Sequence, residues 1–168
     1  MGVREAIEKH QKAAGAVGVI LVLIAVSVSA YSLWPHSQQP LTKAYYTDDD
    51  GQNWFVDSID KVPPFDHNGK TAVRVNLYTC DDSKTVFAGY LERCTPAAKK
   101  KLESEFNSAI SAGKPISSVS IGPDISTFGT EIKKPGDKTW ILRGHYPDSY
   151  KVMDVQCPNG GTVDSVFP

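Results

Sequence analysis

The chain has 168 residues, of which 40% are hydrophobic and 22% are charged, and its net charge at pH 7 is -1. This balance argues against nucleic-acid binding, because a nucleic-acid binder needs a surplus of basic side chains to neutralise phosphates. The hydrophobic content excludes a disordered chain, and 3 cysteines are too few for a domain held together mainly by disulfides.

Residues 13–34 form an apolar run without charged residues, which predicts a transmembrane helix. About 20 apolar residues are enough for a helix to cross a hydrocarbon core about 30 Å thick. Tyr31 and Trp34 stand at the far end of the run, where aromatic side chains favour the membrane interface. We therefore expect a single-pass signal anchor in the lipid bilayer, with residues 1–12 in the cytoplasm and the C-terminal domain on the extracytoplasmic, periplasmic side.

A cleaved signal peptide is the alternative interpretation of the same region. Val28 and Ala30 are small residues at the spacing that a signal-peptidase site requires. Glu5 and Glu8 in the preceding flank, and the length of the apolar run, favour the uncleaved anchor. Under both interpretations the chain beyond about residue 35 is outside the cytoplasm.

Residues 35–43 are polar and contain proline, which predicts a short stalk before the folded domain. Residues 44–168 then combine short alternating segments with one helical pattern. We expect an α+β fold, in which a small and mainly antiparallel β domain packs against one amphipathic helix.

The first motif of this domain, residues 47–54, resembles the Asp-box of sialidase-type repeats. Thr47, Asp49, Gly51 and Trp54 lie at its characteristic positions. The resemblance implies a β-hairpin in which the aspartate caps turn amides and the glycine adopts a positive φ. In that family the motif recurs around a propeller and lies away from the catalytic site, so a single copy implies a hairpin and no glycosidase activity.

The aspartates of this motif also raise a calcium hypothesis. Asp48 and Asp50 fit an EF-type loop that has Gly51 at its sixth position, but Tyr46 then stands where the first carboxylate should be. An EF-hand loop is therefore excluded. A weak surface calcium site that uses Asp48, Asp49 or Asp50 and a set of solvated turn carboxylates are the two remaining interpretations.

A hairpin is predicted over residues 71–92, with strands at 71–79 and 85–92 and a reversal between them. The first strand alternates between two faces. One face carries Val73, Val75 and Leu77, and the other carries Arg74, Asn76 and Tyr78.

A helix follows, with Thr95 as its N-cap and Pro96 at its first position. Gly113 and Pro115 end it. Its expected buried stripe is Ala98, Leu102, Phe106, Ala109 and Ile110. Beyond the helix we expect an irregular segment over 114–130 with a short strand at 117–121, a strand at 139–143, and a strand at 150–157.

The cysteines allow one disulfide in an oxidising compartment. Cys80 and Cys94 lie at opposite ends of the returning strand, some 20 Å apart at about 3.3 Å per residue, which is too far for a bridge. We therefore predict Cys80 with Cys157, and the second choice is Cys94 with Cys157. A zinc or catalytic role is disfavoured, because no C-x-x-C and no suitably spaced histidine is present.

No catalytic or cofactor motif identifies an activity, so we expect no cofactor and binding rather than catalysis. Residues 44–105 and the overall layout are similar to uncharacterised single-pass membrane proteins of planctomycete-type bacteria, which implies a location and no known activity. The predicted function is a binding or structural subunit of an envelope or membrane protein complex, with other subunits as partners. The contact candidates are Tyr45, Tyr46, Trp54 and Phe55. An envelope hydrolase or carbohydrate-binding module is the alternative.

Overall fold

The structure is a computed structural model that describes residues 22, 24–25, 42–80, 85–157 and 160–168. The chain divides into two compact units, residues 1–39 and 40–168. Within the described residues, no helix combines the length and the hydropathy that a bilayer crossing needs. Only Val22, Ile24 and Ala25 of the predicted membrane segment belong to those residues, and they are helical. The rest of that segment, and the stalk up to residue 41, lie outside them.

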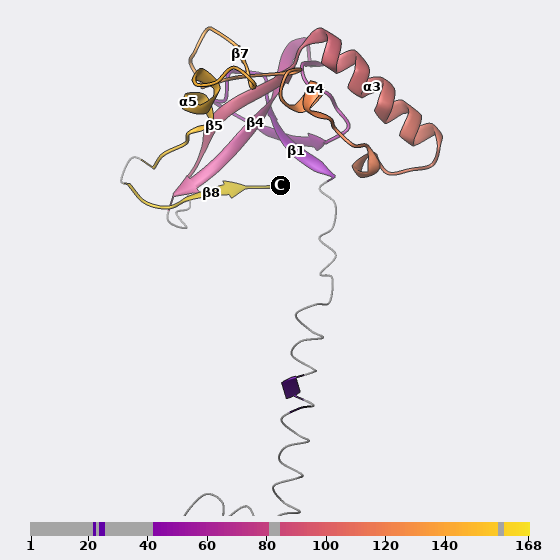
Figure 1. Ribbon diagram of the computed structural model, residues 1–168. Helices are drawn as coiled ribbons and strands as arrows, with labels where there is room; N and C mark the ends of the chain where they lie inside the picture. The colour runs from indigo at the N-terminus through magenta and orange to yellow at the C-terminus, as the bar shows by residue number, and fades with distance from the viewer. Residues whose placement is uncertain (1–21, 23, 26–41, 81–84, 158–159) are drawn as a thin grey trace, which may run out of the picture. The chain divides into compact units, whose positions relative to one another are not determined.

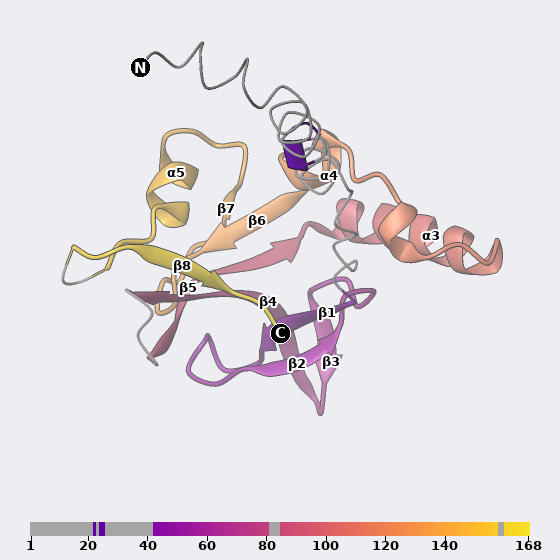
Figure 2. The same ribbon diagram turned by 90° about the horizontal axis from the view of Figure 1, so that it is seen from below.

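The second unit is built on one antiparallel sheet, which has eight strands in the described part of the chain (Figures 1 and 2). The main path is β2-β1-β4-β5-β6-β7, and β3 and β8 each pair with β4. The predicted small and mainly antiparallel β domain is confirmed, but the domain has a few helices instead of the one expected. The strands are β1 Lys43–Thr47, β2 Phe55–Ser58, β3 Phe65–His67, β4 Lys70–Cys80, β5 Val86–Cys94, β6 Thr130–Lys133, β7 Ile141–Leu142 and β8 Val163–Val166.

The long hairpin of β4 and β5 forms the centre of this sheet, as the sequence predicts. Arg74 of β4 lies opposite Glu92 of β5. Because successive side chains of a strand point to opposite faces, the two residues share one face of the sheet and Val75 lies on the other. The hairpin therefore has a polar face, which carries Arg74 and Glu92, and an apolar face. Helices that pack on the polar face cover these charged side chains.

Helix α3 (Pro96–Ser111) begins where its cap predicts, because the side chain of Thr95 accepts a hydrogen bond from the backbone N–H of Ala98 at 3.3 Å. Its buried residues are Ala98, Leu102, Phe106 and Ala109. The prediction is wrong for Ile110, whose side chain is 54% exposed. The helix ends at Ser111, and Gly113 just beyond the cap has a φ of 67°, the left-handed conformation that glycine adopts without a steric penalty.

Loss of the Thr95 hydroxyl will weaken α3. We expect Thr95→Ala to lower the free energy of unfolding by about 1 kcal/mol, since the N–H of Ala98 then loses its acceptor at the helix start. Urea unfolding followed by circular dichroism measures the change. Thr95→Ser keeps the acceptor and serves as the control, so equal losses in the two variants would contradict a capping role.

The structure corrects two strands predicted near the C-terminus. Residues 117–121 form no strand, because Pro115 opens a single 3-10 turn, η1 (Ile116–Ser118), instead. Residues 150–157 are not a strand either, since α5 (Asp148–Met153) occupies their first half. Asp148 in the first turn and Lys151 in the last turn suit the helix dipole, and this favours the short helix.

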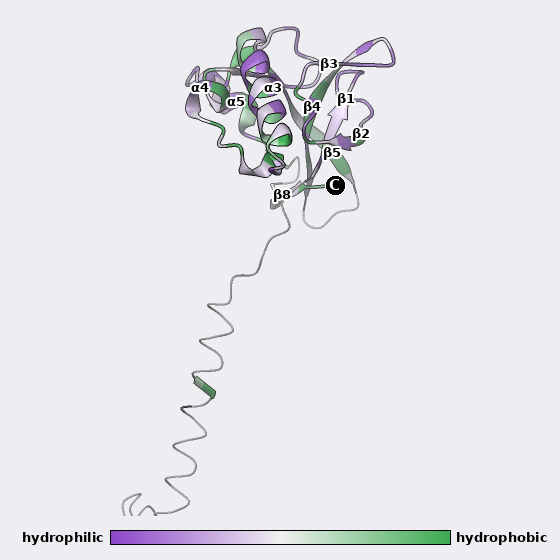
Figure 3. Ribbon diagram, turned by 90° about the vertical axis from the view of Figure 1, so that its right-hand side faces the viewer, coloured by the Kyte–Doolittle hydropathy of each residue, from purple (hydrophilic) through white to green (hydrophobic). Residues whose placement is uncertain are grey.

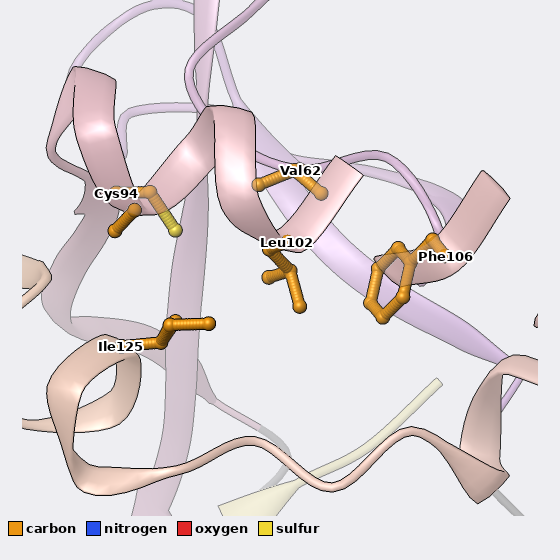
Figure 4. Packing of buried hydrophobic residues seen from close by; sticks show 6 residues of the cluster. Val62, Cys94, Leu102, Phe106 and Ile125 are labelled. Atoms are coloured by element: carbon orange, nitrogen blue, oxygen red, sulfur yellow. The ribbon is translucent and has the colours of Figure 1, made fainter. Parts of the chain in front are cut away.

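The sheet separates two hydrophobic clusters. Figure 3 shows α3, α4 (Pro123–Ser126) and α5 on one side of the sheet, which we call the helix face. The cluster on this face consists of Val62, Cys94, Ala98, Leu102, Phe106 and Ile125, and Figure 4 shows it from close by. We call the opposite side the hairpin face. Its cluster consists of Val73, Val75, Leu77 and Leu91, with Tyr45, Trp54 and Trp140 among the side chains packed against it.

The predicted disulfide between Cys80 and Cys157 is present, with the two Cα atoms 5.8 Å apart. It joins the end of β4 to the segment after α5. Cys94 is buried and free. The preferred pairing is therefore confirmed, and the second choice, Cys94 with Cys157, is wrong.

Candidate functional site

The turn that resembles an Asp-box connects β1 to β2 and is held by its own side chains. The hydroxyl of Thr47 donates to Asp49 Oδ1 at 2.9 Å and accepts from the backbone N–H of Gly51 at 2.9 Å. Asp49 in turn accepts from the backbone N–H and the side-chain amide of Asn53, at 2.9 and 2.7 Å. These hydrogen bonds lower the pKa of the Asp49 carboxyl below its usual range.

The other two carboxylates of the turn have separate partners. Asp48 lies 2.9 Å from His67 Nδ1. Asp50 forms an ion pair with Lys133 and accepts from the backbone N–H of Gly136 at 2.8 Å. Among the residues that the structure describes, no three metal-ligating side chains are grouped to hold an ion. The geometry thus assigns these carboxylates to contacts within the domain.

The same turn packs onto the hairpin face of the sheet. A Cβ atom at Gly51 would lie 3.2 Å from Ala88 Cβ and 3.5 Å from Leu91 Cδ2, and the φ of Gly51 is 84°. The close approach and the positive φ both favour glycine here. The turn therefore packs the β1–β2 hairpin against β5, and its residues stabilise the fold.

The aromatic contact candidates also pack within the domain. Tyr46 is 0% exposed, and its hydroxyl donates to the carbonyl oxygens of Ser58 at 2.9 Å and Lys61 at 3.0 Å. A partner cannot reach this ring, so the prediction of a contact is wrong for Tyr46. The other three candidates are half-buried: Tyr45, Trp54 and Phe55.

A cavity of about 410 Å³ lies on the helix face of the sheet, and we call it the helix-side cavity. Leu102 and Phe106 of α3 form one wall and Ile125 of α4 forms another, and Figure 4 shows their side chains facing a common space. The loop before β3 closes a further side through Ile59 and Val62. The remaining lining residues are Pro63, Arg74, Glu92, Cys94, Ile116, Ser117, Val119, Ile121, Ser126, Thr130 and Arg143.

The sheet supplies the charged part of this cavity. Arg143 Nη1 lies 3.1 Å from one carboxylate oxygen of Glu92, and Arg74 Nη1 lies 3.9 Å from the other. The Nε atom of Arg74 is buried, and no hydrogen-bond acceptor is placed for it in the described part of the chain. Burial raises the pKa of the neighbouring Tyr46, and the Arg74 guanidinium partly offsets that rise.

Cys94 also lines the helix-side cavity, at the end of β5. Its burial raises the pKa of the thiol, and the nearby Glu92 carboxylate adds to the rise. A raised pKa disfavours the thiolate, which is the nucleophilic form of cysteine. The environment of Cys94 therefore favours an inert structural thiol.

This raised pKa has a measurable effect on stability at alkaline pH. The neutral Cys94 thiol contributes its full amount to the free energy of unfolding below its ordinary pKa near 9. Above that pH the thiol ionises in the unfolded chain but not in the folded one, so the contribution is lost as the pH rises towards and through the raised folded-state pKa. Each pH unit above 9 costs up to about 1.4 kcal/mol. We expect the stability of the wild type relative to Cys94→Ala to fall between pH 8 and pH 10 in urea unfolding. A pH-independent difference would contradict the burial effect.

Sequence reasoning missed the charged part of the cavity. The pattern of residues 71–79 places Arg74 on the polar face of a strand, which is usually the solvent face. Here the helices cover that face, and Glu92 and Arg143 join Arg74 from two other strand regions. One signal in the sequence could have predicted this. The apolar stripe of α3 must pack against a face of the sheet, so one face of the β4–β5 hairpin has to be covered.

Comparisons with family models, with curated proteins and with solved structures found no match to this chain.

Proposed function

We propose that this chain is a membrane-anchored extracytoplasmic protein whose C-terminal domain acts by binding, as an accessory or structural subunit of an envelope or membrane complex. Residues 13–34 serve as the anchor, and residues 1–12 remain in the cytoplasm. The uncharged sequence of the anchor segment supports this location.

The helix-side cavity is the observation that carries the binding function. Its volume of about 410 Å³ lies within the range of about 300 to 1,000 Å³ that is common for small-molecule sites. Its walls are mainly apolar, and a few polar groups converge at the sheet, as is usual in such sites. The free thiol beside these groups has a raised pKa, which supports binding rather than nucleophilic catalysis.

The short stalk would keep the C-terminal domain near the membrane that holds the anchor. Residues 35–42 can span at most about 30 Å when fully extended, so the domain would stay close to the bilayer surface. Confinement of this kind raises the effective concentration of the domain near a membrane partner or ligand without any additional contact.

The location is tested with the full chain in cells. Protease added to spheroplasts should digest the C-terminal domain, the protein should resist extraction by alkaline carbonate, and the intact mass should include residues 1–30. A mature chain that begins at Tyr31 would show a cleaved signal. Protection of the C-terminal domain from external protease would indicate the opposite topology, with this domain in the cytoplasm, and would contradict the proposal.

The subunit role is tested by purifying the full chain through a C-terminal tag. Stable co-purifying membrane or envelope subunits are the expected result. A monomer that is retained on a glycan array, or that cleaves a glycan, would instead favour the carbohydrate-binding or hydrolase alternative.

A further inference from the structure

We infer that the helix-side cavity binds a single-chain amphiphile with one anionic head group, such as a fatty carboxylate. The inference rests on the proposed binding function and names the ligand class for its site. Its apolar part would occupy the space between α3 and α4, and its head group would meet Arg74 and Arg143 at the sheet.

The walls determine the apolar part of the ligand. Leu102, Phe106 and Ile125 present hydrocarbon to the cavity, and Ile116 of η1 and the aliphatic residues that follow it add to this lining. Apolar surface of this kind is stabilised by covering it with another apolar group. The volume lies at the lower end of the range for ligand sites, which suits one acyl chain better than a two-chain lipid.

The charges determine the head group. Two guanidinium groups face one carboxylate, so the cavity carries a net positive charge. Arg143 Nη1 is within hydrogen-bond distance of Glu92, whereas Arg74 Nη1 is 3.9 Å from its carboxylate, beyond that distance. Arg74 also forms a hydrogen bond with the Tyr46 side chain, but a guanidinium has five N–H donors, so further donors remain on this side chain, which is 29% exposed. A guanidinium is suited to bind a carboxylate through two hydrogen bonds.

The buried Nε atom of Arg74 is the second observation that points to an anion. A buried donor without an acceptor destabilises the folded state, and an acceptor oxygen brought by a ligand would remove that cost. The neighbouring hydroxyls leave the Nε donor without an acceptor. The Tyr46 hydroxyl donates to backbone carbonyls and interacts with the Arg74 guanidinium, but Nε itself has no partner in the described part of the chain. Thr130 Oγ1 donates to the carbonyl of Ile125 at 2.8 Å.

The chain provides its own reporter for occupancy. Cys94 lines the cavity and is the free cysteine of the structure, while the other two form the disulfide. A ligand that fills the cavity will slow alkylation of Cys94. The rate is measured by mass spectrometry on the full chain in phosphatidylcholine nanodiscs treated with N-ethylmaleimide.

The test compares dodecanoate, dodecanol and dodecyltrimethylammonium as probes. We expect dodecanoate to slow the alkylation of Cys94 at concentrations at least tenfold below those needed for the other two. Arg74→Met should remove this preference for dodecanoate. Arg93→Met is the matched control, because Arg93 has a similar exposure of 34% but pairs with Glu131 and contacts Trp140 of the hairpin-face cluster.

The outcomes separate the ligand class from the binding function. Equal protection by all three probes, or unchanged selectivity in Arg74→Met, would overturn the anionic head group and leave the cavity as an apolar binding site. Cys94 is only 8% exposed, so a thiol that is not alkylated in the absence of probes is explained by its burial. In that case the rise in melting temperature with dodecanoate is compared between the wild type and Arg74→Met, and a rise that does not depend on Arg74 would overturn the inference. If no probe slows the alkylation of Cys94, the inferred ligand is also wrong. The subunit role would still be tested separately by the co-purification experiment.

Discussion

Removing the disulfide by changing Cys80 and Cys157 to serine will lower the free energy of unfolding by about 4 kcal/mol. The bond closes a loop with a sequence separation of 77, so its loss greatly increases the conformational freedom of the unfolded chain. It also releases the segment after α5 from the end of β4, where β8 pairs with Cys80 through Val163. Urea unfolding of the full chain in nanodiscs, followed by tryptophan fluorescence, measures the change.

Two comparisons make this prediction specific. The wild type under reducing conditions should lose a similar amount of stability, whereas the double variant should not respond to reductant. Cys94→Ala removes the third cysteine without opening the bridge, so it should retain the response to reductant. A loss below about 1 kcal/mol in the double variant would mean that native contacts, and not the bridge, restrict this segment.

The elements that could be predicted are those whose signals are local. Alternation of residues 71–79 predicts β4, and the Thr95-Pro96 pair marks the start of α3 because the cap and the first helical position have distinct requirements. The length of the hairpin excludes a bond between Cys80 and Cys94, which reduced the possible disulfides to the two pairings with Cys157. These inferences need only the geometry of a single strand pair or of one helical turn.

Other features depend on contacts between distant segments. The segment at 150–157 alternates like a strand, yet α5 forms there and packs over the sheet beside β5 and β6. Its apolar residues suit either structure, so tertiary packing decides between them. The strand β8 was not predicted, because a strand of four residues has little local signal and is stabilised by pairing with β4.

The candidate site illustrates the same limit. Arg74, Glu92 and Arg143 come from separate regions of the sequence, and only the pairing of β4 with β5 and the course of β7 bring them together. The sequence shows that each residue is charged. It does not show that a helix covers the face on which they meet.

The ion pair between Asp50 and Lys133 is the other contact with a large expected effect. It connects the β1–β2 turn to β6, two segments that are far apart in the sequence. The Lys133 side chain is only 10% exposed, and its ammonium group also donates to the carbonyl of Asp137 at 2.7 Å. Asp50 additionally holds a φ of 65°, a conformation that aspartate tolerates better than alanine.

We therefore expect Asp50→Ala to lower the free energy of unfolding by about 3 kcal/mol, because it strands a nearly buried ammonium and introduces backbone strain. Asp50→Asn tolerates the backbone conformation and keeps one acceptor oxygen for Lys133 or Gly136, so it should cost about half as much. Adding Lys133→Met to Asp50→Ala removes the stranded charge and should recover at least about 1 kcal/mol in a double-mutant cycle. Asp48→Ala, in the same turn but paired with His67, should cost less than about 1 kcal/mol. Equal costs for Asp48→Ala and Asp50→Ala, or a cycle without coupling, would show that the turn is held to the sheet by packing at Gly51 and not by its charge.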